Sequence, residues 1–270
     1  MNRHDVSGQA PGAPRLALEH EVRGAGEPVL FISGANDTRR GWDMTAPALE
    51  DTFACVVFDN RDAGTSPRAE ADYTLADMAA DTAGVLDRAG LASAHVVGHS
   101  LGSAIAQELC LGAPERVRSL TLIGSWARTD EYVRAMMQMW LDWSHTLDDE
   151  RFATSCALFW FGESAIRSQG MDAIARECVT LLQAQGRDAF RRQIRAAMAH
   201  DALDRLGAIG VPTQVVWGEQ ERVFSHHHAR QLASAIPGAT LVCIPAAGHC
   251  CTVEAPEPVN AALRAFLLRL

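Results

Sequence analysis

The chain of 270 residues contains no lysine, so all 24 of its basic residues are arginines. Catalysis through a lysine Schiff base is therefore excluded. Uncharged apolar runs long enough to cross a bilayer are also missing, which predicts a globular protein rather than a membrane protein. Residues 1–14 lack the apolar segment of a secretory signal, and we expect them to form a flexible tail and the protein to be cytoplasmic.

The cysteines and histidines show no pattern typical of a disulfide framework or a metal site. Seven cysteines, an odd number, are scattered from Cys55 to Cys251, which favours reduced thiols. Three consecutive histidines at 226–228 lie in an expected loop, where their side chains point in different directions, so we predict no metal. The net charge of −9 argues against a basic face, and thus against nucleic acid or an anionic membrane as a partner.

Short apolar strands alternate with helical patterns over most of the chain. This alternation indicates βαβ units and an α/β fold, with a mainly parallel central sheet flanked by helices. The expected strands are 16–22, 29–32, 54–58, 96–97, 117–123, 213–218 and 240–245. The expected helices are 42–49, 74–90, 103–111, 228–236 and 258–270.

Between residues 126 and 200 the strand patterns stop, and the sequence is helical in character and rich in bulky apolar side chains. A helical insertion here would lie over the carboxyl edge of the sheet, where open α/β folds bind ligands. We expect a cap over 126–200 and a single core made of 15–125 and 201–270. Most of its aromatic side chains should form the cap's own core, and some of its four tryptophans should line an apolar substrate pocket: Trp126, Trp140, Trp143 and Trp160.

A predicted strand runs directly into Gly98-His99-Ser100-Leu101-Gly102 and then into a helix-forming stretch. This is the context of a nucleophile elbow, in which a serine at the tip of a strained turn is lifted clear of the sheet. Glycines on both sides relieve the crowding, and the first amides of the helix face any negative charge that develops beside the serine. We therefore predict Ser100 as a nucleophile.

The candidate base is His249, which follows the last expected strand in a loop of small residues. A serine hydroxyl is a poor nucleophile at neutral pH, so it needs a base within hydrogen-bond reach and a third group that orients this base. The position after a parallel strand places His249 at the same sheet edge as Ser100. These two residues are predicted to act together.

Three motifs together resemble the α/β-hydrolase superfamily, in particular its cofactor-free branch of enol-lactonases, carboxylesterases, perhydrolases and natural-product methylesterases. They are the elbow around Ser100, the arginine-containing loop at 58–66, and His249 followed by Glu254-x-Pro256. The resemblance covers residues 16–270, and the chain order of nucleophile, acid and histidine agrees with it. It implies no cofactor, a helical cap inserted after the sixth strand, and an oxyanion hole formed by the amides of Ala35 and Leu101.

The loop after the strand at 29–32 departs from the family pattern, because it begins Ser33-Gly34 where the family usually has His-Gly. The oxyanion hole is built from backbone amides, so a serine can support the same geometry. We expect Ser33 to lie at the substrate pocket.

The acid position of the family is occupied by Glu221, where aspartate is usual. Glutamate has the same charge and one more methylene, so it can accept the imidazole N–H bond if the loop retreats slightly. Glu219 matches a position that is usually acidic without being catalytic. Asp130 lies on a loop that carries the acid in some members of the family. We favour Glu221 and keep Asp130 as the alternative.

Together, Ser100, His249 and Glu221 predict a serine hydrolase that cleaves a carboxylic ester or lactone of a medium-sized hydrophobic small molecule through an acyl-enzyme. The lysine-free composition is typical of a G+C-rich genome. Together with the hydrophobic substrate that an aromatic cap favours, it leads us to expect a setting in bacterial secondary metabolism or aromatic degradation. Two alternatives stay open: a non-hydrolytic cyclase or lyase, and a slow-turnover binding protein. The sequence also leaves open whether the chain forms a homo-oligomer.

Overall fold

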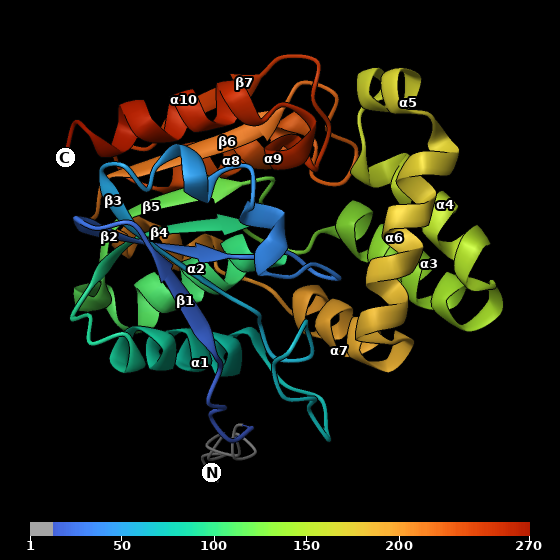
Figure 1. Cartoon of the computed structure of the whole chain (residues 1–270), viewed down its shortest axis with the longest axis horizontal. Helices are drawn as coiled ribbons and strands as arrows, with labels where there is room; N and C mark the ends of the chain where they lie inside the picture. Colours follow the sequence, from blue (N-terminus) through green and yellow to red (C-terminus); the bar gives the residue numbers. More distant parts are fainter. Residues whose placement is uncertain (1–12) are drawn as a thin grey trace, which may run out of the picture.

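The computed structural model describes residues 13–270, and a seven-stranded sheet lies at its centre (Figure 1). The strand order is β1-β3-β2-β4-β5-β6-β7; β1 runs antiparallel to β3, and all other neighbours are parallel. The predicted α/β class with a mainly parallel sheet is thus confirmed. The strands are β1 (His20–Arg23), β2 (Glu27–Ile32), β3 (Phe53–Phe58), β4 (Ala94–His99), β5 (Val117–Ile123), β6 (Thr213–Gly218) and β7 (Thr240–Ile244).

Helices cover both faces of this sheet (Figure 1). The α-helices are α1 (Leu75–Arg88), α2 (Leu101–Gly112), α8 (His226–Ala235), α9 (Cys251–Glu254) and α10 (Pro256–Leu267). The short 3-10 helices are η1 (Arg39–Trp42), η2 (Ala46–Ala48), η3 (Pro114–Arg116) and η4 (Leu203–Ala208). Of the expected tail, residues 1–12 lie outside the described residues.

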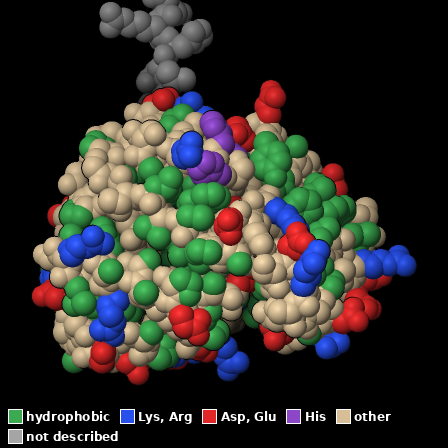
Figure 2. All heavy atoms as spheres, turned by 90° about the horizontal axis from the view of Figure 1, so that it is seen from above, with side chains coloured by type: hydrophobic (Ala, Val, Ile, Leu, Met, Phe, Trp, Pro, Cys, Tyr) green, Lys and Arg blue, Asp and Glu red, His purple; other side chains and the backbone are tan. Residues whose placement is uncertain are grey.

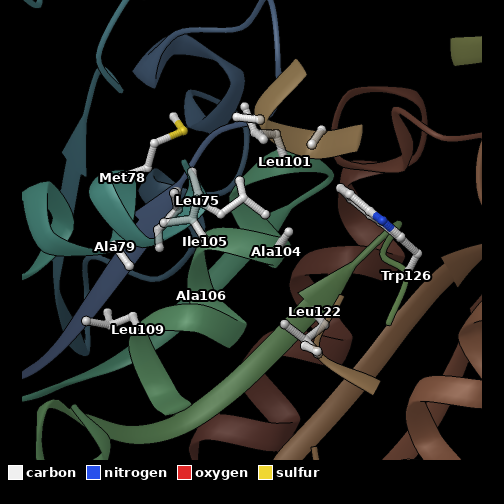
Figure 3. Packing of buried hydrophobic residues seen from close by; sticks show 14 of the residues in the cluster. Leu75, Met78, Ala79, Leu101, Ala104, Ile105, Ala106, Leu109, Leu122 and Trp126 are labelled. Carbon is white, nitrogen blue, oxygen red and sulfur yellow. The ribbon is translucent and has the colours of Figure 1, made fainter. Parts of the chain in front are cut away.

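The strands are apolar on both faces, which is why both faces are covered. Successive side chains of a strand point to opposite faces, so in β2 Leu30 belongs to the apolar cluster that includes α1, α2 and α8, whereas Phe31 belongs to the cluster that includes η1, η2 and α10. Figure 3 shows part of the first cluster, with labelled side chains from α1, α2 and β5. Because β4 to β7 are parallel neighbours, the loops that follow them meet at one sheet edge.

Five helices between residues 131 and 198 form the insertion, on the right of Figure 1. They are α3 (Glu131–Thr146), α4 (Asp149–Trp160), α5 (Glu163–Gln169), α6 (Met171–Gln185) and α7 (Arg187–Met198). The two ends of the insertion lie side by side, since Arg128 and Asp201 form an antiparallel bridge and the amide of Thr129 donates to the carbonyl of His200 at 2.9 Å. We call these five helices the cap.

The cap follows β5, the fifth strand of the described chain, whereas the resemblance placed it after a sixth. One reason is that a single strand, β1, precedes the first parallel strand in residues 13–270. This strand is also shorter than the expected 16–22. The backbone before it is bound to α1 instead, because the amide of Leu16 donates to Asp81 at 2.6 Å and the carbonyl of Leu18 accepts from Arg88.

Two other local predictions were wrong. The helix expected at 42–49 is replaced by the 3-10 helices η1 and η2, because Pro47 has no N–H to donate in an α-helical ladder. The histidines at 226–228 form the first turn of α8 rather than a loop. Ser225, a residue type that favours helix starts, is the N-cap residue directly before them.

The surface shows no large area of one charge on the face seen in Figure 2, where acidic and basic side chains are interspersed. In the described part of the chain, no helix is both long and apolar enough to span a membrane. Among residues 13–270, no group of three or more His, Cys, Asp and Glu side chains is placed to hold a metal ion.

Candidate active site

Ser100 lies in the turn between β4 and α2, with backbone angles of φ 53° and ψ −120°. Residues other than glycine rarely adopt a positive φ, so this serine is held in a strained turn. The packing around the turn leaves no room for a side chain at Gly102, where a Cβ would collide with the carbonyl of Ile32. The backbone therefore has the form expected of a nucleophile elbow.

His249 follows β7 and is paired with the carboxylate of Glu221, which follows β6. Its Nδ1 lies 2.8 Å from Oε2 of Glu221, and the two side chains are 5% and 0% exposed. The other carboxylate oxygen, Oε1, accepts the amide of Val223 at 2.7 Å, which fixes the acid in place. With Nδ1–H donating to Glu221, Nε2 is the ring nitrogen left to accept a proton.

The imidazole of His249 and the hydroxyl of Ser100 line the same cavity. The ring is held by packing, with its centroid 4.9 Å from that of His99 and 5.5 Å from that of Phe224. Among the described residues, the hydroxyl of Ser100 forms no hydrogen bond with this ring. Catalytic hydrogen bonds of this kind are often long until substrate binds. The structure thus brings the predicted nucleophile and the predicted base to one cavity, with no hydrogen bond between them.

The other two carboxylates considered from the sequence serve elsewhere. Asp130 caps α3 through the amide of Val133 at 2.9 Å, and its Oδ2 lies 3.1 Å from Nε2 of His228. Glu219 is exposed and accepts the amide of Ala246 at 2.9 Å. Within residues 13–270, neither carboxylate is hydrogen-bonded to His249, so Glu221 is the acid that the geometry favours.

Gly124, which follows β5, lies against the paired side chains and was not singled out from the sequence. Its φ is +53°, and a Cβ at this position would lie 3.0 Å from Nδ1 of His249 and 3.3 Å from Oε2 of Glu221. A side chain here would therefore press on both members of the pair. The signal was present, because Gly124 directly follows a predicted strand that ends at the same sheet edge as Ser100.

Ala35 and Leu101 line the same cavity as Ser100. Leu101 is the first residue of α2, so its N–H has no partner within the helix. Within the described residues, the amide of Ala35 also donates to no other group. An oxyanion hole requires two such amide donors, and these are the two that the resemblance named.

The cavity has a volume of about 260 Å³ and lies between the sheet edge and the cap. Three of the four tryptophans named from the sequence line it: Trp126, just before the cap, and Trp140 and Trp160 within it. Its wall is mainly apolar, which suits the hydrophobic part of a small molecule. Further apolar lining comes from Met137, Phe161 and Phe190.

Two residues predicted at the pocket lie outside this lining. The hydroxyl of Ser33 is fully buried and donates to the carbonyl of Thr38 at 2.8 Å, so it braces the loop that follows β2. The indole of Trp143 packs against Phe159, with ring centroids 6.2 Å apart, because α3 turns that side chain toward α4. Neither side chain lines the cavity, so both pocket assignments were wrong. Ser33 instead stabilises the loop that carries Ala35.

Several polar residues at the cavity were missed, among them His99 and Asp37. His99 donates from Nε2–H to the carbonyl of His249 at 2.9 Å, and burial, with the nearby His249, lowers the pKa of His99 to about 3. It therefore stays neutral at neutral pH and acts as a support for the loop of the base. Asp37 also lines the cavity, and burial raises the pKa of its carboxyl to about 7. His99 stood inside the elbow motif, but nothing in the sequence shows which loop it touches.

Comparisons with known proteins agree with this architecture. A protein of Azorhizobium caulinodans named "Putative carbamate hydrolase RutD" is 29% identical over 249 residues, which cover 92% of this chain and 94% of that relative. A solved thermophilic esterase from Thermogutta terrifontis is 25% identical, with a TM-score of 0.83 and 93% of each chain covered.

A second solved structure shows the likeness of the fold alone. The enol-lactonase from Burkholderia xenovorans LB400 has a TM-score of 0.86 at 20% identity, and the match covers 96% of this chain and all of that chain, 100%. The family model described as alpha/beta hydrolase fold matches residues 27–256, which is most of the sequence. From its sheet, its elbow and this match, the chain belongs to the alpha/beta hydrolase family that its motifs resembled.

Proposed function

We propose that this chain is a serine hydrolase that cleaves a carboxylic ester or lactone of a medium-sized hydrophobic small molecule. The observation that carries the proposal is the buried pair of His249 and Glu221 at a cavity that Ser100 also lines. A histidine oriented by a carboxylate is the group that can take the proton of a serine hydroxyl.

In the first half of the reaction, Oγ of Ser100 attacks the acyl carbon while Nε2 of His249 takes its proton. Glu221 stabilises the imidazolium that forms. The amides of Ala35 and Leu101 donate to the oxyanion of the tetrahedral intermediate, and the loss of one such donor typically costs about 3 kcal/mol of transition-state stabilisation. When the intermediate collapses, the bond to the leaving oxygen breaks, and His249 gives its proton to that oxygen.

In the second half, water takes the place of the leaving alcohol. His249 removes a proton from the water, whose oxygen attacks the acyl carbon of the acyl-enzyme. The same two amides stabilise the second oxyanion. Its collapse releases the acid product and returns the proton from His249 to Ser100, so no cofactor is needed.

The names of the similar proteins support a hydrolase of ester or amide type. They mention a carbamate for the Azorhizobium relative and an esterase for the Thermogutta protein. The apolar wall around Trp126, Trp140 and Trp160 favours an ester or lactone with a hydrophobic acyl or alcohol part. The smallest carbamates would leave most of this wall without a contact.

The mechanism is tested by labelling with a fluorophosphonate probe, which reacts with activated serines. We expect the native chain to be labelled within minutes and the Ser100→Ala variant to remain unlabelled and inactive. Absence of labelling in the native protein, or full activity in Ser100→Ala, would reject the acyl-enzyme. Those results would favour the cyclase, lyase or binding-protein alternatives.

The substrate class is tested by a panel of esters, lactones, carbamates and amides that share one hydrophobic group. We expect kcat/KM to be highest for the esters and lactones and to rise with the size of the apolar group until the cavity is filled. A carbamate hydrolysed faster than its matched ester would move the assignment toward the activity for which the Azorhizobium relative is named.

A further inference from the structure

The cap segment 160–164, which joins α4 to α5, touches both loops that carry the paired side chains of the active site. We call it the clamp segment. Its contact with the histidine loop runs through Glu254, whose Oε2 accepts the amide of Gly162 at 2.8 Å and the amide of Gly248 at 2.9 Å. One carboxylate oxygen therefore bridges the cap and the residue directly before His249.

A second bond joins the same loop to the clamp segment on the other side of His249. The amide of Cys250 donates to the carbonyl of Trp160 at 2.9 Å. The junction is also closely packed, because a Cβ at Gly162 would lie 2.8 Å from the amide nitrogen of Gly248. On one side of His249, the amide of Gly248 is held by the carboxylate of Glu254. On the other side, the amide of Cys250 is held by the carbonyl of Trp160 in the cap.

The contact with the acid loop runs through Gln220, the residue before Glu221. Its Oε1 accepts the amide of Ser164 at 2.9 Å, and its Nε2 donates to the hydroxyl of Ser164 at 2.9 Å. The amide of Gln220 donates in turn to Ala247 in the histidine loop at 2.7 Å. The two loops and the clamp segment therefore form one hydrogen-bonded unit.

The side chains of the clamp segment reach the substrate cavity, since Trp160 and Phe161 both line it. Glu254 itself lies largely inside the protein. Its Oε1 is buried and has no hydrogen-bond partner among the described residues, and burial raises the pKa of this carboxyl above its ordinary value. In the reaction proposed above, Glu254 touches neither Ser100 nor the acyl group.

We infer that Glu254 is a positioning residue, which aligns His249 with Ser100 by holding the amides of Gly162 and Gly248 together. The inference rests on the proposed function, because it assigns a role within that reaction. The inference assigns a role to the glutamate of the Glu254-x-Pro256 motif, which takes no part in the chemical steps proposed above.

The test compares two substitutions of similar volume, Glu254→Gln and Glu254→Met. Glutamine keeps an oxygen that can accept both amides, so kcat should stay within about three-fold of the native value. Methionine removes the acceptor, and kcat should fall by about 10- to 100-fold, as small misplacements of catalytic groups do, with KM changed less than about three-fold. The labelling rate of Ser100 by fluorophosphonate should fall with kcat.

The matched control is Glu219→Met. Glu219 also accepts an amide of the histidine loop, that of Ala246, but among the described residues it makes no hydrogen bond to the cap. We expect kcat and the labelling rate of this variant to stay close to the native values. An equal loss in Glu219→Met, native kcat in Glu254→Met, or a loss confined to KM would each overturn the inference.

A failure of Glu254→Met to fold, seen by circular dichroism, shifts the test to Gln220→Met. That variant removes both bonds to Ser164, and kcat should again fall while KM holds; an unchanged kcat contradicts the clamp. Labelling separates the two proposals. If the native chain is not labelled, the proposed function fails; if it is labelled and Glu254→Met is labelled equally fast, only the inference about Glu254 fails.

Discussion

The side chain of Glu221 reaches the imidazole of His249 because the loop after β6 folds around this glutamate. Its Oε1 accepts the amides of Val223 at 2.7 Å and Phe224 at 3.3 Å, while Oε2 receives the ring of His249. The added methylene is accommodated by this turn after β6, so the longer acid occupies the place of an aspartate without losing its contact.

Removing the charge of this acid should disable the reaction. In Glu221→Gln the amide can present a donor to Nδ1, which favours the wrong imidazole tautomer, and kcat should fall by about 10³- to 10⁴-fold. The matched Asp130→Asn variant removes a carboxylate that binds His228 and should keep kcat within about three-fold. Steady-state kinetics on the best ester decide between them, and the opposite ranking would assign the acid to Asp130.

Local motifs predicted Ser100 and His249, and the family resemblance predicted Glu221; each lies in a loop that follows a strand. They gave no role to Gly124 or Glu254. The role of these residues depends on contacts between segments far apart in the chain, such as Glu254 with Gly162, and no local pattern encodes such a pairing. Ser33 was misplaced for a different, local reason: its hydroxyl turns back to donate to the carbonyl of Thr38 in the same loop.

At the scale of elements, the strands were the most predictable part of the fold. Their apolar runs and the turns that follow them identify β2, β3, β5 and β6 with small shifts in the ends. The spatial order, in which β3 lies outside β2 and β4 inside it, is a matter of long-range pairing that the runs do not encode. The helix expected at 42–49 failed on one local feature, the missing N–H of Pro47.

Helix α7 joins the cap to the loop of the proposed oxyanion hole through Gln193, whose side chain is fully buried. Its Oε1 accepts the amide of Asn36 at 3.0 Å and a donor from Gln185 at 2.7 Å, and its Nε2 donates to the carbonyl of Arg61 at 3.2 Å. Asn36 directly follows Ala35. The orientation of the Ala35 amide therefore depends in part on the cap.

Gln193→Leu should lower the free energy of unfolding by about 1–3 kcal/mol, because it leaves buried backbone groups without partners. It should also lower kcat, since Asn36 would lose the bond that holds it beside Ala35. Urea unfolding and kinetics measure the two effects. Gln183→Leu on α6, where the side chain makes only an exposed bond to Asp149, is the control and should change neither. Equal stability of the two variants would contradict this role for Gln193.

At the scale of the whole molecule, three buried histidines are kept neutral in separate parts of the fold. Burial lowers the pKa of His95 in β4, lowers that of His99 at the elbow to about 3, and lowers that of His200 at the cap junction to about 4. An unfolded histidine has a pKa near 6.5, so the unfolded chain binds these protons first as the pH falls.

The free energy of unfolding should therefore be fully retained above about pH 6.5 and should decrease as the pH falls toward 4. Each histidine can contribute a slope of up to about 1.4 kcal/mol per pH unit in this range. In His200→Gln, the slope of the unfolding free energy against pH should decrease by the amount that corresponds to about one proton. Urea unfolding at a series of pH values would measure this change. A curve for His200→Gln parallel to that of the native chain would show that His200 takes no part.

The neighbouring ends of the cap, at Arg128 and Asp201, bear on how this enzyme could be re-engineered. Because the insertion leaves and re-enters the core at one point, a foreign helical lobe could be spliced in there without stretching the sheet. Joining the ends of the new lobe is nonetheless easier than replacing the hydrogen bonds that the cap makes to the core. A transplanted lobe would have to supply an amide for Glu254, a partner for Gln220 and an acceptor for the amide of Asn36. Without these contacts, the new pocket would cover a serine that lacks its supporting loops.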